Sequence, residues 1–137
     1  MCKSLKILLI EDNQIEIMKM KRTLSFLELT HDLIEAKNAE IALEILEDKT
    51  NLPDLILLDL NMPKISGIEF LSILKDNKHL RHIPTVILTT SNNQKDLEEC
   101  YRIGVSGYIL KPLKYDDYVT KIKNVLAYWS INELKTY

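Results

Sequence analysis

The sequence alternates short, continuous apolar runs with longer stretches in which apolar residues recur every three or four positions. A continuous apolar run without polar alternation is typical of a strand that is buried on both faces. The longer stretches are typical of amphipathic helices. A run is followed by a helical pattern five times along the chain. Five such units in succession predict one α/β domain, in which helices cover both faces of a parallel sheet.

The expected elements have definite bounds. Strands are predicted at residues 6–10, 31–36, 55–58, 85–89 and 107–110. Helices are predicted from the cap Asn13 to about residue 27, at 38–47, at 67–77, from the polar loop 91–93 to 103, and at 115–128. Asn13 can cap the first of these helices, and Gly104 is suited to end the fourth.

Composition excludes several classes of protein. With 137 residues, 46% of them apolar and 28% charged, the chain is expected to fold as one domain. A net charge of −2 argues against a general nucleic-acid binder, so we expect no direct DNA binding. The only glycines are Gly67, Gly104 and Gly107, which excludes both the G-x-G-x-x-G loop and the Walker A loop.

The sequence also indicates a location. No apolar stretch approaches the roughly 18 residues of a membrane span, so no membrane association is expected. The apolar run at 7–10 is too short for the core of a signal peptide. Two cysteines, Cys2 and Cys100, are too few for a disulfide framework. We therefore expect reduced thiols and a cytoplasmic protein.

Polar side chains mark the ends of four of the five predicted strands, as the last residue of the strand or shortly after it. In chain order they are Glu11 and Asp12, then Asp59 with Asn61 two residues later, then Thr89, and finally Lys111. The carboxyl ends of parallel strands share one edge of the sheet, where ligands of such folds bind. We therefore expect these side chains to gather in one site.

The residue types at this edge indicate phosphoryl transfer. Three neighbouring carboxylates repel one another and call for a cation, and an all-oxygen site suits Mg²⁺. An aspartate can act as a nucleophile on phosphorus and form an aspartyl phosphate. The metal ion and a lysine would neutralise the transferred oxygens, and a threonine hydroxyl could bond to them.

Four sequence motifs together resemble one known family. They are IEDN at 10–13, LDLNMP at 58–63, LTTS at 88–91 and YILKP at 108–112. In this order, each at a strand end, they resemble the receiver domain of bacterial two-component response regulators, the CheY-like family. The resemblance implies a flavodoxin-like, doubly wound (βα)5 three-layer sandwich, with a parallel five-stranded sheet in the order 2-1-3-4-5.

The resemblance also implies roles for individual residues. Asp59 resembles the phosphoacceptor, and Lys111 resembles the lysine that pairs with the phosphoryl group. Thr89 and Tyr108 resemble the switch pair of the family. The implied function is to accept a phosphoryl group from a partner histidine kinase and to change one interaction surface. Such a protein is a signalling module that catalyses only its own phosphorylation and dephosphorylation.

The metal site is implied in the same way. Asp12, Asp59 and the backbone carbonyl of Asn61 resemble the direct Mg²⁺ ligands of the family. Glu11 occupies the position that reaches the metal mostly through water, where many members carry aspartate. The bond between Lys111 and the proline after it resembles the cis peptide of the family, but the sequence does not show the isomer.

A finer resemblance is to stand-alone receivers that are paired with bacterial phytochrome kinases. Its features are RHIPTV at 81–86, the motif at 89–91, the segment 96–101 and the pair Tyr128-Trp129. It predicts a receiver domain at 1–128, a short tail at 129–137 and no output domain. The expected partners are a sensor histidine kinase or phosphotransfer protein, a downstream protein target and a second copy in a homodimer.

Two alternative functions are each opposed by a feature of the sequence. An Asp-nucleophile phosphatase usually carries Asp-x-Asp and a capping insertion, whereas Asp59-Leu60-Asn61 lacks the second acid and the chain has no room for a cap. A receiver-like scaffold would work without phosphorylation. The scaffold is disfavoured because the residues needed for phosphorylation are all present, namely Asp12, Asp59, Thr89 and Lys111.

Overall fold

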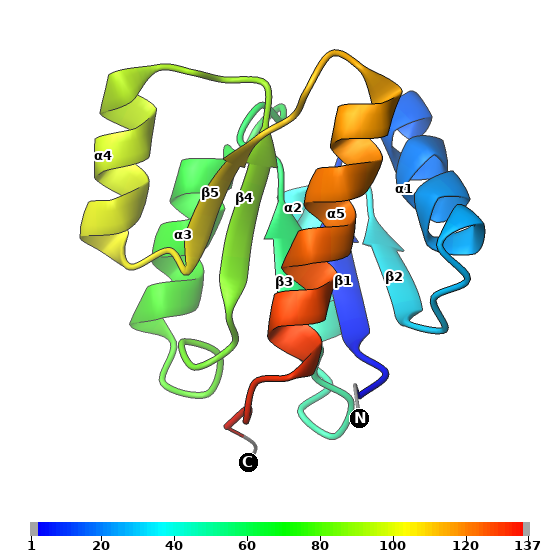
Figure 1. The fold of residues 1–137 in the computed structure, drawn as a ribbon. Helices are drawn as coiled ribbons and strands as arrows, with labels where there is room; N and C mark the ends of the chain where they lie inside the picture. Colours follow the sequence, from blue (N-terminus) through cyan, green and yellow to red (C-terminus); the bar gives the residue numbers. More distant parts are fainter. Residues whose placement is uncertain (1–2, 136–137) are drawn as a thin grey trace.

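The computed structural model describes residues 3–135 and contains five strands that alternate with five helices (Figure 1). Cys2 lies outside the described residues. In chain order the elements are β1 (Lys6–Ile10), α1 (Gln14–Phe26), β2 (Asp32–Ala36), α2 (Ala39–Leu46), β3 (Leu55–Leu58), α3 (Gly67–Asp76), β4 (Thr85–Thr89), α4 (Gln94–Ile103), β5 (Gly107–Leu110) and α5 (Tyr115–Ser130). None of these helices is long or apolar enough to cross a bilayer.

The five strands form one parallel sheet in the order β2-β1-β3-β4-β5. This confirms the predicted flavodoxin-like order. The order reverses beside β1, which pairs with β2 on one side and with β3 on the other. Such a reversal opens a crevice beyond the carboxyl ends of the two strands at which it occurs. The topology alone therefore predicts a ligand-binding site at the ends of β1 and β3.

Two apolar layers enclose the sheet, and alternate residues of each strand enter opposite layers. Leu8 and Ile10 of β1 pack with α2, α3 and α4, whereas Ile7 and Leu9 pack with α1 and α5. Figure 1 shows α1 and α5 on the near face of the sheet. Because both faces are covered, an inner strand needs apolar side chains at every position, which is why the strand bounds follow the apolar runs so closely.

Side-chain caps set the first residues of four helices. Asn13, Asn38, Ser66 and Asn93 each accept a hydrogen bond from a backbone N–H in the first turn of α1, α2, α3 and α4 respectively. At the other end of α4, Gly104 adopts a left-handed conformation with φ of 119°. The predicted roles of Asn13 and Gly104 are therefore confirmed.

The last helix is longer than predicted. The sequence pattern placed its end at Tyr128, whereas α5 continues to Ser130. Trp129 packs against the apolar layer between the sheet and α1 and α5, and Ser130 is buried. The helix therefore ends two residues later than predicted, while the domain boundary at residue 128 stays a prediction.

Gly67 permits an unusually close approach between α3 and the chain after β3. A Cβ at this position would lie 2.5 Å from the carbonyl oxygen of Asp59 and 2.6 Å from the Cα of Leu60. The N–H of Gly67 donates to the carbonyl of Leu60 at 3.1 Å. The first turn of α3 is thus held directly against the backbone that carries Asp59.

Candidate functional site

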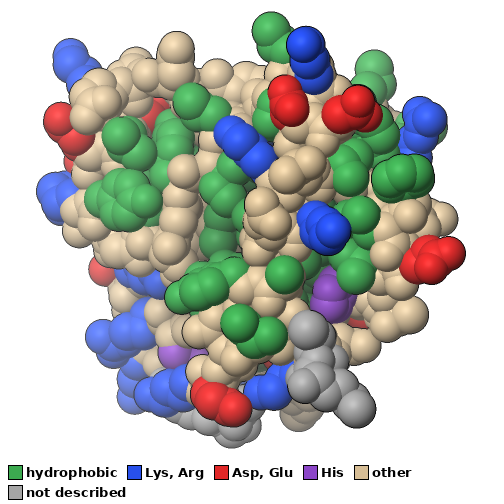
Figure 2. All heavy atoms as spheres, in the orientation of Figure 1, with side chains coloured by type: hydrophobic (Ala, Val, Ile, Leu, Met, Phe, Trp, Pro, Cys, Tyr) green, Lys and Arg blue, Asp and Glu red, His purple; other side chains and the backbone are tan. Residues whose placement is uncertain are grey.

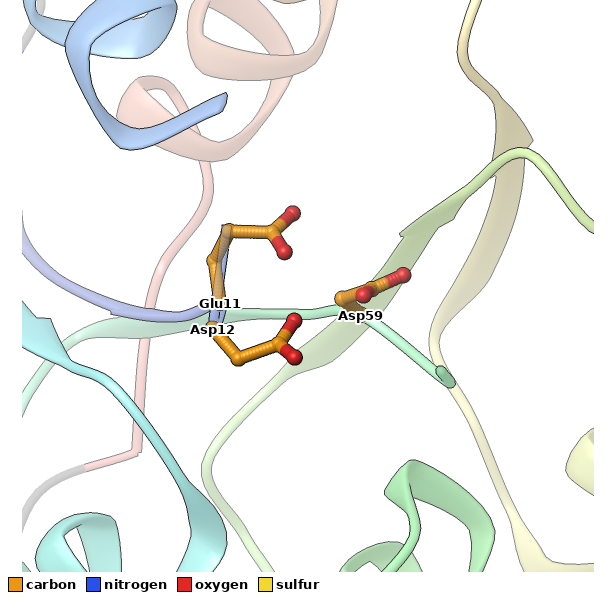
Figure 3. A group of neighbouring side chains, drawn as sticks. All are labelled: Glu11, Asp12 and Asp59. Carbon is orange, nitrogen blue, oxygen red and sulfur yellow. The ribbon is translucent and has the colours of Figure 1, made fainter. Parts of the chain in front are cut away.

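Three carboxylates meet at the carboxyl ends of the two inner strands. Glu11 and Asp12 follow β1, and Asp59 follows β3; one oxygen from each lies within 4.8 Å of the others. Figure 3 shows the side chains of Glu11 and Asp12 extending from the end of β1 toward Asp59. The N–H of Asp59 donates to the carbonyl of Ile10 at 3.1 Å, which holds the two strand ends together. The predicted acidic cluster is present.

The three acids differ in burial. Glu11 and Asp59 are 3% and 7% exposed, whereas Asp12 is exposed to solvent. Burial raises the pKa of Glu11 to about 7, against the opposing pull of the Lys111 ammonium. Burial likewise raises the pKa of Asp59, which Lys111 partly offsets. Both shifts express mainly the cost of keeping a charged carboxylate away from water, and a neighbouring acid adds a smaller contribution in each case; a bound cation would offset both.

Lys111 enters the site from the end of β5, and its ammonium is almost fully buried. Its Nζ lies 2.6 Å from Glu11 Oε1, and its backbone N–H donates to the carbonyl of Thr89 at 2.8 Å. The predicted lysine therefore lies at the site, where its hydrogen-bond partner is Glu11. A second acid, Glu16 in α1, lies 3.7 Å from the same ammonium.

Sequence reasoning missed Glu16. The available signal was an acid in the first turn of the helix that begins two residues after Asp12. Such acids usually serve the helix dipole, so the position alone did not indicate a contact with the site.

Asn61 lies beside the phosphoacceptor candidate. It is exposed, and its backbone N–H acts to lower the pKa of Asp59, against the larger effect of burial. Its carbonyl as a metal ligand stays a prediction. Every peptide bond among the described residues is trans, so the bond between Lys111 and Pro112 is not the cis bond that the resemblance implied.

Thr89 and Tyr108 are joined through one backbone segment. The hydroxyl of the fully buried Thr89 accepts a hydrogen bond from the N–H of Ser91 at 3.2 Å. The hydroxyl of Tyr108 donates to the carbonyl of the same Ser91 at 2.9 Å. Burial raises the pKa of Tyr108. The two candidate switch residues are therefore linked by a single peptide segment of the loop before α4.

The donor set fits a hard divalent cation. All candidate ligands are oxygens, and Asp12 offers a solvent-exposed carboxylate beside the buried Asp59. Mg²⁺ and Mn²⁺ both accept carboxylates, carbonyls and water. Lys111 occupies the Glu11 side of the cluster, which leaves the Asp12 side open to an ion.

Comparison with known proteins gives one consistent result. The family model described as "Response regulator receiver domain" matches residues 7–123. The chain is 33% identical to response regulator Rcp1 of Synechocystis over 90% of this chain and 87% of Rcp1. It is 36% identical to the probable methanogenesis regulatory protein FilR2 of Methanothrix harundinacea over 90% of this chain and 82% of FilR2.

Solved structures agree with this match. The phosphorylated cyanobacterial phytochrome response regulator RcpA superimposes with a TM-score of 0.90 at 31% identity, over 98% of this chain and all of RcpA. The Mn²⁺-bound form of Rcp1 gives a TM-score of 0.87 at 31% identity, over 96% of this chain and 99% of Rcp1. The neighbours thus include one receiver that carries a phosphoryl group and one that holds a divalent cation.

Proposed function

Because this chain belongs to the family of response regulator receiver domains, we propose that it is a switch of two-component signalling that accepts a phosphoryl group on Asp59. Receivers are signalling proteins rather than conventional enzymes, and they interact with histidine kinases and downstream targets. The observation that carries the proposal is the buried carboxylate of Asp59, which faces two further acids with a lysine within the same cluster.

The transfer uses the nucleophilic oxygen of Asp59. That oxygen attacks phosphorus, and the bond from phosphorus to the donor breaks with its electron pair. For a phosphohistidine donor the broken bond is phosphorus–nitrogen, and the released imidazole takes a proton from solvent. Lys111 then exchanges its contact with Glu11 for a phosphoryl oxygen, and Thr89 can donate its hydroxyl to another.

Asp12, Asp59 and the carbonyl of Asn61 would hold Mg²⁺ as direct ligands, and Glu11 would contribute through water. The ion would supply charge neutralisation on the transferred oxygens. We expect Asp12→Ala to lower Mg²⁺ affinity more than Glu11→Ala does, because Asp12 would be a direct ligand whereas Glu11 would contribute only through water. Calorimetric titration of the two variants measures this, and equal losses would contradict the assignment.

The structural change would then spread from Thr89 through the backbone of Ser91. If Thr89 turns its hydroxyl to the phosphoryl group, the N–H of Ser91 loses its acceptor and the loop before α4 moves. The hydroxyl of Tyr108, which is bonded to the same residue, moves with it. We therefore propose that phosphorylation changes the surface of α4, β5 and α5.

That surface suits a protein partner. Figure 2 shows apolar side chains gathered over α4, β5 and α5. The large exposed ones in this region are Tyr101, Leu110, Leu113, Tyr128 and Ile131. Exposed apolar groups of this kind mark interaction sites, and we propose that the downstream target or a second copy of the chain binds here.

Treatment with acetyl phosphate and Mg²⁺, followed by intact mass measurement, tests the proposal. The wild-type protein should gain about 80 Da, and Asp59→Asn should not. Asp76→Asn, at an exposed position of α3, is the matched control and should behave as wild type. Undiminished labelling of Asp59→Asn would refute the assignment, and no labelling of the wild type would favour a phosphorylation-independent scaffold.

A further inference from the structure

Lys111 is held by two acids, and only one of them belongs to the predicted site. The ammonium lies 2.6 Å from Glu11 and 3.7 Å from Glu16, and the lysine side chain is 6% exposed. Glu11 directly follows β1, and Glu16 lies in the first turn of α1. A phosphoryl group on Asp59 must therefore compete with both acids for this lysine.

The environment of Glu16 is not that of an ordinary acid in a first helical turn. Its side chain is only 22% exposed, and its Oε2 is buried and accepts no hydrogen bond from any described residue. That oxygen lies 3.7 Å from the ammonium groups of both Lys19 and Lys111. An acid that served only the helix dipole would gain nothing from such burial.

We propose that Glu16 is a positioning residue that, together with Glu11, holds Lys111 on the α1 side of the site and so slows phosphorylation of Asp59. The inference rests on the proposed function, since it concerns the rate of that reaction. The ion pairs of Glu16 are with Lys19 and Lys111, and neither lysine is the phosphoacceptor or a ligand proposed for the metal. It acts through Lys111, which must leave it before pairing with a phosphoryl oxygen.

A second contact links the same acid to α5. Lys19, the other cation beside Glu16, lies 4.4 Å from the centre of the Tyr118 ring. When Lys111 moves to the phosphoryl group, Lys19 remains as the cation beside Glu16. Glu16 therefore lies between Lys111 of the site and the contact of Lys19 with α5.

The direct test replaces Glu16 by its neutral isostere. Glu16→Gln should increase the initial rate of Asp59 phosphorylation by acetyl phosphate about three- to tenfold at saturating Mg²⁺, because Lys111 is released more easily. Glu44→Gln, which removes the same charge from an exposed position of α2, should leave the rate unchanged. A rate for Glu16→Gln equal to wild type would overturn the inference while the proposed function stands.

Two further measurements separate positioning from other effects. In a Lys111→Ala background, Glu16→Gln should have no effect; an equal increase there would mean that Glu16 merely repels the donor or supports the helix, and would overturn the proposal. In the unphosphorylated protein, Glu16→Gln should shift the side-chain NMR resonances of Lys111, and Glu44→Gln should not. Unshifted resonances would overturn the proposal even if no phosphorylation were observed.

Discussion

Replacing Gly67 by alanine should damage both stability and the phosphorylation site. The added Cβ would meet the carbonyl oxygen of Asp59 at 2.5 Å, the Cα of Leu60 at 2.6 Å and the carbonyl carbon of Asp59 at 3.1 Å. All three atoms are backbone, so no side-chain rotation can relieve the clash. Either α3 or the segment after β3 has to move.

The size of the effect follows from these distances. An ordinary contact begins at 3.4 Å, so the nearest approach is too short by about 0.9 Å. Forced shifts of this kind in well-packed regions cost about 1–3 kcal/mol. For a domain of this size, that corresponds to a fall in Tm of roughly 3–15 °C. A shift near 1 Å in the backbone of a reacting residue can lower its rate by up to about 100-fold.

Gly107→Ala is the matched control. Its Cβ would lie 3.7 Å from the methyl groups of Val86, which is an ordinary contact. Thermal unfolding by circular dichroism should show a large fall in Tm for Gly67→Ala and little change for the control. Acetyl phosphate labelling, measured well below both transitions, should be slowed only in Gly67→Ala. Equal melting temperatures for the two variants would refute the steric reasoning.

Three further changes test other parts of the fold. Glu28, just after α1, has a φ of 56°, a conformation that glycine adopts without a Cβ clash. Glu28→Gly should therefore raise the free energy of unfolding in urea by up to about 1 kcal/mol. A lower free energy of unfolding would contradict this. Asn38→Ala should cost about 1 kcal/mol by removing the cap of α2, and Asn38→Ser should retain most of the stability. Cys100 is buried, and burial raises the pKa of its thiol to about 11. In a Cys2→Ser variant we therefore expect Cys100 to react with iodoacetamide at pH 8 only after the protein unfolds. Rapid labelling of the native protein would contradict this and show that the region around Cys100 opens.

The sequence predicted the fold well because its local and global signals agree. Inner strands of a parallel sheet must be apolar on both faces, so the bounds of β1, β3 and β4 could be read directly from continuous apolar runs. The first residue of a helix could also be predicted where a capping side chain precedes it, as at Asn13. The end of α5 was not readable, because the burial of Trp129 depends on a layer built from distant segments.

The candidate site was predictable for a different reason. Residues that directly follow parallel strands must share one edge, so the meeting of Asp12 with Asp59 follows from topology. The partners of Lys111 do not follow from topology, because a long side chain can reach several acids. Its contact with Glu16 requires the direction of α1, and the linkage of Thr89 to Tyr108 runs through backbone atoms of Ser91 that carry no sequence signal.

The pairing of β1 with both β2 and β3 also bears on how the chain is synthesised. β1 is made first but cannot complete its hydrogen bonding until Leu55–Leu58 has been translated. At roughly 5–20 residues per second, this wait lasts several seconds. During that time Ile7–Leu8–Leu9–Ile10 is an apolar segment with a free edge, of the kind that aggregates between chains. Glu11 and Asp12 directly follow the segment, and their charges discourage such pairing. The same carboxylates that form the candidate site would therefore protect the nascent chain before the site exists.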